Sequence, residues 1–541
     1  MPRKRKSQSN SSDPERYRQL SIFDILESDT YEVLSRDAVA DYNPVARTAD
    51  YMRQIVESEK AWTTTIQTAR EHLLEKDPRE LYFDFFTDLK RQIEQDSSKS
   101  ARLARLLEQV AIRGFGMTKE QVRIDKPPKG SSRWQVSLDV SSIQQHLQSH
   151  IVGEHFLNPI NSDDNVWENC NFLIASSDVS QHRSSVPLPA RFFTRSVPFL
   201  LNNAAGAVLR VQGSQSSYDS PRFNPQPNEE LLKWMLIDPS YQDELEPEDY
   251  QRCLASAMDV GQYKFDHQYL LNADQNRPDI ILRDGSLFPQ DAYLDNFLIE
   301  NRRGDFTREA IRDLLHCLNC ARDYGIIYCG VAKNVRLKVY SAVLDWYIAK
   351  EIDPNWEVGN YTLNDGQMMT LLLSSPSFIG DNLKQTIATC LIRRSFTTRA
   401  TLNEKAKNLN DLDSHFKLYE KQHDPRFFAP YKQLCKIFHM YMFFIGHSKS
   451  PTQQLPRYEF FYDDSIGSVS SIAQKILTAL RYSSIDIDQD HSFMAEEPIT
   501  YIIPTVTQQA HIYSKDVGKY ITVGTGQLLM SQYKALLSEM V

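Results

Sequence analysis

Three apolar runs that each end in a charged residue constrain the fold of this chain more than any other feature. FLIASSD ends at Asp178, DIILRD ends at Asp284 and IIYCGVAK ends at Lys333. Helical patterns lie between them, at residues 247–271 and 306–323. Near-continuous apolar strands that alternate with helices are typical of a sheet covered on both faces, so the sequence predicts an α/β architecture.

The first third of the chain has a different pattern. From residue 44 to residue 113, apolar side chains recur at steps of three and four residues, which predicts helices that pack against one another. QVRIDKPP and RWQVSLDVS then predict a β-hairpin around the turn PPKGSS. The expected organisation is a disordered basic tail at residues 1–16, a mainly helical region with a β-hairpin at 17–165, and an α/β domain at 166–541.

Charge and hydropathy limit the classes of protein to which this chain can belong. Its formal net charge of -9 argues against a binder that coats nucleic acid non-specifically, although it allows an enzyme with a local basic channel. Mean hydropathy is -0.47, and no apolar run reaches the ~18 residues of a membrane span. The basic N-terminus lacks the apolar segment of a secretory signal, so a cytoplasmic protein is expected.

Two of the strand ends share one design. In each, a serine follows the aspartate by two residues, at Ser180 after Asp178 and at Ser286 after Asp284. Carboxylates at the ends of neighbouring strands can converge on hard cations such as Mg²⁺ or Mn²⁺. Two such ions can activate a water and stabilise the leaving oxygen of a phosphodiester. The alternative for either aspartate is an ordinary polar turn, because Asp-Gly-Ser is also a common way for a chain to leave a strand.

Two further residues can take part in such chemistry. Lys333 leaves the third strand, where its ammonium group can hold a phosphate as a point charge. His511 follows Pro504 by seven residues, at the start of an apparent helix, where it can bind metal or carry protons. The alternatives are a solvated lysine and a structural histidine.

Taken in order, these segments resemble the NurA family of DNA-repair nucleases. The matching residues are Asp178 in DVSQHR, Asp284 in DGSL, Lys333 in GVAK and His511 in PTVTQQAH. LPRYEFFYD, with Arg457 and Glu459, resembles the Arg-x-Glu strand that precedes the last motif of the family. The resemblance covers roughly residues 166–541.

The resemblance implies both a fold and an activity. The fold is a ribonuclease H-like mixed sheet flanked by helices. The activity is that of a Mn²⁺-dependent 5′-to-3′ exonuclease with endonuclease activity on single strands, and Mg²⁺ is the alternative metal. The resemblance also implies a homodimer that acts on DNA in double-strand break repair, together with a HerA-type hexameric ATPase.

The chain departs from the family pattern at two positions near the expected site. Val179 stands where glycine is usual, and His267 stands where a helical glutamate is expected, 17 residues before Asp284. Asp266 is therefore chosen as the helical carboxylate, with Asp259, two helical turns earlier, as the alternative.

The resulting hypothesis has two forms. In the catalytic form, Asp178, Asp266, Asp284 and His511 hold one or two Mn²⁺ ions and Lys333 contacts the phosphate. In the rival form, a degenerate nuclease domain binds DNA, an ATPase or a clamp and cleaves nothing, which Val179 and the missing glutamate favour. The candidates for contact with the DNA backbone are arginines: Arg183, Arg302, Arg303, Arg393, Arg394 and Arg457.

A second motif lies close to the N-terminus. Gln19-Leu20-Ser21-Ile22-Phe23 resembles the pentapeptide that binds the bacterial sliding clamp. In such peptides a leucine and a phenylalanine enter an apolar pocket, and a glutamine supplies hydrogen bonds. The sequence therefore predicts a sliding clamp as a partner through Gln19, Leu20 and Phe23. The alternative is that these apolar side chains pack on the protein's own core.

Overall fold

The structure is a computed structural model in which residues Thr65–Val541 form one compact unit. Residues on both sides of the boundary expected at position 165 belong to this unit. The basic tail at 1–16 and the segment Gln19–Phe23 lie outside the described residues. The described residues are 64–118, 120–129, 134–160, 171–187, 196–212, 215–218, 232–237, 247–272, 277–289, 302–333, 335, 337–356, 358, 363–373, 386–394, 425–446, 454–463, 465–482 and 504–539.

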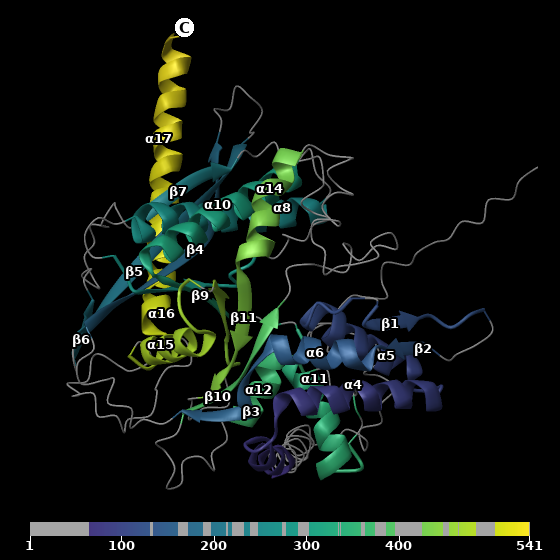
Figure 1. Cartoon of the computed structure of the whole chain (residues 1–541). Coiled ribbons are helices and arrows are strands. Elements are labelled where there is room, and N and C mark those ends of the chain that lie inside the picture. Colours follow the sequence, from purple (N-terminus) through teal and green to yellow (C-terminus); the bar gives the residue numbers. More distant parts are fainter. Residues whose placement is uncertain are drawn as a thin grey trace, which may run out of the picture. The chain divides into compact units, whose positions relative to one another are not determined.

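A mixed sheet, 11-stranded over the described residues, forms the centre of the unit (Figure 1). Its middle strands β4 (Asn171–Pro187), β8 (Ile280–Asp284) and β9 (Ile327–Ala332) are parallel. β5 (Ser196–Gln212) pairs antiparallel with β4, and β13 (Arg457–Tyr462) pairs antiparallel with β9. The other strands are β3 (Ile151–Ile160), β6 (Gln215–Tyr218), β7 (Leu232–Ile237), β10 (Thr386–Arg394), β11 (His439–Phe443) and β12 (Ile445–Gly446). The predicted α/β architecture, a mixed sheet flanked by helices, is confirmed.

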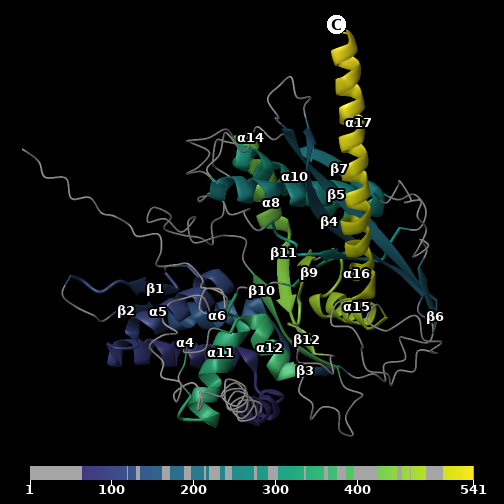
Figure 2. The same cartoon turned by 180° about the vertical axis from the view of Figure 1, so that it is seen from behind.

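Helices cover both faces of the middle strands, as the two opposite views show (Figures 1 and 2). On one face, α8 (Pro247–Phe265), α10 (Arg302–Tyr324) and α14 (Pro425–Ile437) form a core with Ala175 and Ile281 of the sheet. On the other face, α15 (Val469–Tyr482) and α16 (Thr505–Ile512) form a core with Ile174 and Leu282. Because successive side chains of a strand point to opposite faces, neighbouring residues of β4 and of β8 belong to different layers.

Two of the three predicted strand ends are correct and one is wrong. β8 ends at Asp284, and Lys333 follows the last residue of β9 directly. β4, however, continues beyond Asp178 to Pro187, because β5 pairs with it along its whole length. Asp178 therefore lies in the middle of a strand, opposite Ala205. The pairing with β5 cannot be read from the residues around Asp178. The polar residues that follow Asp178 therefore led to the prediction of a turn.

In the N-terminal region, the described residues from 64 to 150 are mainly helical and include a β-hairpin. α4 (Pro78–Gln95) begins where Asp77 accepts a hydrogen bond from the backbone N–H of Arg79 at 2.8 Å. The hairpin consists of β1 (Val122–Asp125) and β2 (Gln135–Leu138). The same region contributes β3 to the main sheet, where it pairs with β10. The other described helices of this region are α5 (Ser100–Glu108), η3 (Gln109–Gly114) and α6 (Val140–His150). After β9 the chain forms α11 (Tyr340–Tyr347), η8 (Ile348–Ile352) and α12 (Asp365–Leu373).

The C-terminal segment is helical from α16 onward. α16 leads through η10 (Tyr513–Val517) into α17 (Gly518–Glu539), which extends away from the sheet (Figure 1). Pro504 caps α16, and His511 lies in its last turn rather than at its start, which corrects the predicted position. α17 exposes apolar side chains, including Tyr520, Val523 and Leu528. Among the described helices, none combines the length and the apolar character needed to cross a membrane.

Candidate metal centre

Asp178 and Asp284 occupy neighbouring positions on two parallel strands. Ser177 of β4 lies opposite Arg283 of β8, so the next residue along each strand is one of the two aspartates. Ile174, four residues before Asp178, belongs to the core under α15 and α16. Because side chains alternate between faces, Asp178 points to that same layer, and Asp284 lies beside it. The parallel register therefore brings together two carboxylates that are far apart in sequence.

Lys333 is placed next to them by the third parallel strand. Asp284 lies opposite Val331 of β9, and Lys333 follows Val331 by two residues on the same face. Its Nζ atom lies 2.6 Å from Oδ2 of Asp284. The side chain of Lys333 keeps 31% of its surface exposed, so its ammonium group is also open to solvent.

His511 and Ser514 reach the site from the helical layer above the sheet. The Nδ1 atom of His511 lies 2.8 Å from Oδ2 of Asp178. Ser514, three residues later and fully buried, donates from its hydroxyl to the same oxygen at 2.6 Å. Ser180 hydrogen-bonds in turn to the backbone oxygen of Ser514, which ties β4 to η10. Sequence reasoning missed Ser514, although its spacing of one helical turn from His511 could have indicated it.

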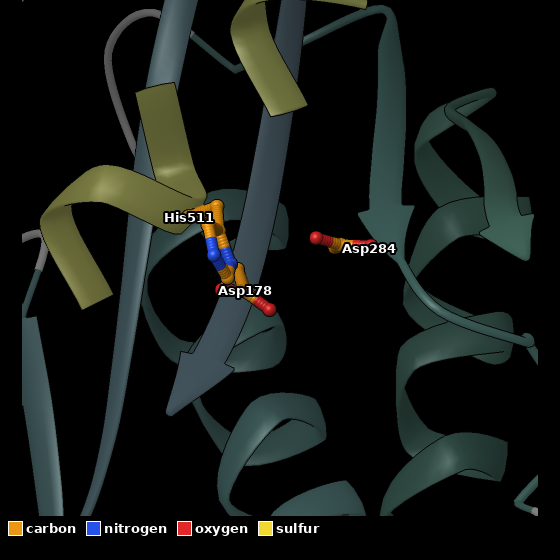
Figure 3. Close-up of side chains that lie close together, drawn as sticks. All are labelled: Asp178, Asp284 and His511. Atoms are coloured by element: carbon orange, nitrogen blue, oxygen red, sulfur yellow. Dashed lines mark hydrogen bonds and ion pairs between the residues drawn. The ribbon is translucent and has the colours of Figure 1, made fainter. Parts of the chain in front are cut away.

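Asp178, Asp284 and His511 form a compact group of potential metal ligands (Figure 3). One ligand atom from each residue lies within 4.8 Å of the others. Asp178 is buried, Asp284 is half-buried and His511 is exposed, so the group opens to solvent on the side of α16. The residues described by the structure contain no other group of this kind.

The charges in this group influence one another's protonation. Burial, together with the neighbouring Asp178 carboxylate, raises the pKa of Asp284, while the ammonium group of Lys333 opposes that rise. The hydrogen bond to Asp178 raises the pKa of His511, although partial burial of the ring opposes this. Two carboxylates, a lysine and a readily protonated histidine thus share one site.

Gln262 of α8 supports the two strands from the opposite face of the sheet. Its side-chain amide is buried and donates to the backbone oxygen of Ser177 at 2.9 Å. The same Nε2 atom lies 3.4 Å from the backbone oxygen of Asp284. Gln262 therefore links the chain beside Asp178 to the end of β8. Sequence reasoning missed it, because a lone glutamine on an amphipathic helix carries no signal of such a role.

Neither helical carboxylate proposed from the sequence joins the group. Asp266 is the first residue of η7 (Asp266–Leu271), which continues α8 on the opposite face of the sheet. It is fully buried and accepts a hydrogen bond from the hydroxyl of Tyr328. Burial raises its pKa to about 6, against opposing hydrogen bonds. The alternative, Asp259, is paired with Arg283 at 2.5 Å. The sheet therefore separates both residues from the side chains of the group, which corrects the assignment of Asp266.

Arg457 is another correction, because it is buried rather than available to DNA. Its Nε atom donates to Oε1 of Glu459 at 2.8 Å within β13. The second carboxylate oxygen of Glu459 accepts hydrogen bonds from the hydroxyl of Ser286 at 2.7 Å and from the backbone N–H of Leu287 at 3.0 Å. Burial alone raises the pKa of Glu459, but the neighbouring arginines and these hydrogen bonds bring it below its ordinary value. The Arg-x-Glu pair thus holds the turn that follows Asp284.

Of the other arginine candidates, the structure describes the side chains of Arg393 and Arg394. Arg393 contacts the ring of His439 at 2.8 Å, and Arg394 lies 3.7 Å from Glu459. The side chains of Arg183, Arg302 and Arg303 lie outside the described residues.

A scan against protein-family models and a search of curated proteins found no match for this chain.

Proposed function

We propose that this chain is a divalent-metal-dependent nuclease that hydrolyses phosphodiester bonds in DNA. The observation that carries the proposal is the convergence of Asp178, Asp284 and His511, whose ligand atoms lie within 4.8 Å of one another. Three residues separated by more than a hundred positions meet at one point because of strand register and helix packing.

The donor set of the group fits a hard divalent cation. Two carboxylate oxygens and one imidazole nitrogen are ligands that Mn²⁺ accepts readily, and Mg²⁺ is the alternative. The partial exposure of His511 and Asp284 leaves a side on which a cation and a phosphate can enter. Three ligand residues are enough for one ion, and a second ion lacks the helical carboxylate that was expected for it.

The protein's own residues would orient the ligands, bind the phosphate and hold protons. A bound divalent cation would supply Lewis-acid activation of the phosphodiester and of the attacking water. Ser514 holds one oxygen of Asp178 through a 2.6 Å hydrogen bond, which fixes the orientation of that carboxylate. Lys333, partly exposed beside Asp284, is placed to hold a phosphate oxygen as a point charge. As an alternative to binding the ion, His511, whose pKa is raised by Asp178, can hold a proton at the open side of the site.

The resemblance to NurA nucleases extends the proposal to fold type, substrate and partners. A mixed sheet with carboxylates on adjacent parallel strands is compatible with a ribonuclease H-like fold. On this proposal the chain is an exonuclease with single-strand endonuclease activity that acts in DNA double-strand break repair with a HerA-type ATPase. The exposed apolar side chains of α17 support a homodimer, because such surfaces are commonly covered by association.

A non-catalytic DNA- or ATPase-binding subunit is the second candidate, and a specific observation favours it. Asp266 and Asp259 are both engaged on the far side of the sheet, and Lys333 lies 2.6 Å from Asp284, where it competes with a metal ion for that carboxylate. Such a centre could bind an ion weakly and support no cleavage.

The proposal is tested with the full chain, Mn²⁺ and end-labelled single- and double-stranded DNA. We expect cleavage that chelation abolishes, and a Mn²⁺-dependent rise in melting temperature, because an ion that binds only the folded state stabilises it. Asp284→Asn should abolish both effects without loss of fold. Asp305→Asn, at an exposed position in α10, is the matched control and should keep both.

The outcomes separate the two candidates. A Mn²⁺-dependent rise in melting temperature without cleavage of either DNA supports the non-catalytic subunit. Equal cleavage by the protein and by Asp284→Asn would remove the site assignment.

A further inference from the structure

A polar cavity lies between α4, α5 and the segment that contains α11 and η8. Figure 1 shows these helices next to one another. Its volume is about 280 Å³, close to the lower end of the ~300–1,000 Å³ range typical of small-molecule sites. None of its lining residues belongs to the candidate metal centre. The nuclease proposal gives this cavity no role.

Positive charge dominates the lining of the cavity. Arg91, Lys99, Arg102 and Lys350 line it, and Asp88 is the one carboxylate among the described lining residues. Both oxygens of Asp88 are already engaged, by Trp346 and Gln92 at 2.8 and 2.7 Å and by Arg91. Asp88 therefore forms a local pair with Arg91. Lys350 lies 3.4 Å from Glu351 and 3.9 Å from Asp84, two acids outside the lining, so basic side chains outnumber acidic ones in the lining itself.

The end of a helix adds to this positive potential. Lys99 is the N-cap residue of α5, and no side chain accepts a hydrogen bond from the first turn at this cap. The backbone N–H groups at a helix N-terminus carry partial positive charge and attract anions. Lys99 and the start of α5 thus favour an anion from the same side as Arg102.

The apolar part of the lining consists of fixed aromatic side chains. The indole N–H of Trp346 donates to Asp88 at 2.8 Å, and that of Trp356 donates to Asp345 at 2.6 Å. Lys350 lies with its Nζ atom 4.9 Å from the centre of the Trp346 ring. Two buried indoles held by hydrogen bonds give a wall that is formed before any ligand arrives, which lowers the entropic cost of binding.

We propose that this cavity binds a phosphomonoester of nucleotide size, with the phosphate at Lys99, Arg102 and Lys350 and the remainder against the tryptophan wall. Arginine and lysine are the side chains that recognise phosphate, by forked hydrogen bonds and by point charge respectively. Two sources share this chemistry, a free mononucleotide and the 5′-phosphorylated nucleotide at the end of a DNA strand.

The experiment measures binding of deoxyadenosine monophosphate to the full chain by calorimetry, with a chelator present so that no metal-dependent cleavage takes place. We expect a dissociation constant below about 1 mM that weakens as salt is raised. Deoxyadenosine, which lacks the phosphate, should bind at least about tenfold more weakly, the cost of losing a charged hydrogen bond. Equal binding of the two ligands, or no binding of either, overturns the proposal.

Variants locate the binding within the cavity. Arg102→Gln and Lys350→Gln should each weaken binding by about tenfold. Arg105→Gln is the matched control, because Arg105 lies exposed on the same helix and does not line the cavity. Melting temperatures close to that of the parent protein identify variants that remain folded. Equal loss of binding in Arg102→Gln and Arg105→Gln would contradict the location. Equal loss of binding in Lys350→Gln and Arg105→Gln would contradict it as well.

Competition distinguishes the two sources of the phosphate. A 5′-phosphorylated oligonucleotide that displaces the mononucleotide, when its 5′-hydroxyl counterpart does not, identifies a DNA end as the ligand. Binding of the free mononucleotide alone identifies a small-molecule site. Both results support a phosphomonoester site, and neither depends on whether the metal centre cleaves DNA.

Discussion

The buried carboxyl group of Asp266 lies on the opposite face of the sheet from the side chains of Asp178 and Asp284. Its side chain lies in the layer of α8 and α10, where the hydroxyl of Tyr328 donates to it. Burial brings its pKa to about 6, so the folded protein holds this proton at pH values where an unfolded chain has lost it. Asp178 and Asp284, on the other face, are the two carboxylates of the candidate metal centre.

This difference predicts how stability depends on pH. Between about pH 4 and pH 6 the folded state binds more protons than the unfolded state, so the free energy of unfolding decreases as pH rises through that window. Asp266→Asn should remove this decrease and raise stability at pH 7 by roughly 3 kcal/mol. Urea unfolding from pH 4 to pH 8 provides the measurement, with Asp305→Asn as an exposed control.

The same variant tests the corrected assignment of the metal ligands. Asp266→Asn should leave the Mn²⁺-dependent rise in melting temperature unchanged, because its side chain lies on the other face of the sheet. Loss of the Mn²⁺ effect in this variant would restore Asp266 to the ligand set.

Site residues could be predicted from the sequence where their position depends on neighbouring residues, and not where it depends on tertiary contacts. The ends of β8 and β9 depend on neighbouring residues, and Asp284 and Lys333 were placed correctly. The choice of Asp266 failed because the pattern of a helix identifies its apolar stripe and not the face of the sheet that it will cover. Ser514 and Gln262 act through tertiary contacts that no local pattern records.

At the scale of the element, the turn after β8 depends on its neighbour β9. A Cβ atom at Gly330 would lie 2.8 Å from the backbone nitrogen of Leu287 and 2.9 Å from the backbone oxygen of Gly285. Both contacts are with backbone, which cannot rotate away as a side chain can. Because Gly330 has no side chain, the turn that follows Asp284 can pack directly against β9.

We expect Gly330→Ala to destabilise the protein by about 1–3 kcal/mol, because it forces this turn outward. It should also weaken the response to Mn²⁺, since the displaced turn begins next to Asp284. Gly524→Ala is the control, because a Cβ there meets nothing within 4 Å and replaces glycine within a helix. An unchanged urea midpoint for Gly330→Ala would show that the turn relaxes without cost.

At the scale of the whole molecule, the N-terminal helical region and the main sheet form one unit. β3 supplies a partner for β10, and the hydroxyl of Tyr82 in α4 donates to the backbone oxygen of Val339, just before α11. Local periodicity predicted helices and a hairpin in this region, and the residues that the structure describes between 64 and 150 contain both. Its connection to the sheet could not be predicted, because strand pairing between β3 and β10 joins segments more than two hundred residues apart.

This connection predicts the result of truncation. A chain that begins at residue 166 lacks β3 and α4, so it exposes one edge of β10 and the apolar surface that Phe156 and Leu157 bury. We expect it to aggregate and to show no cooperative unfolding, whereas a chain that begins at residue 65 should unfold cooperatively. Size-exclusion chromatography and urea titration provide the comparison, and a well-folded 166–541 chain would contradict it.

The two strand carboxylates differ in how freely they can adjust. Asp178 sits in the interior of β4, paired with β5 on one side, and the pairing with β8 on the other side ends at the preceding residue, Ser177. Asp284 is the final residue of β8 and is followed by Gly285, whose φ of 108° few other residues tolerate. The backbone at Asp178 is therefore held within a strand, whereas the backbone at Asp284 lies at a strand end and can adjust more easily. On the proposed metal function, we expect ions of different radius to be accommodated by movement at Asp284 rather than at Asp178, against the hydrogen bonds with which Glu459 holds the turn after Asp284.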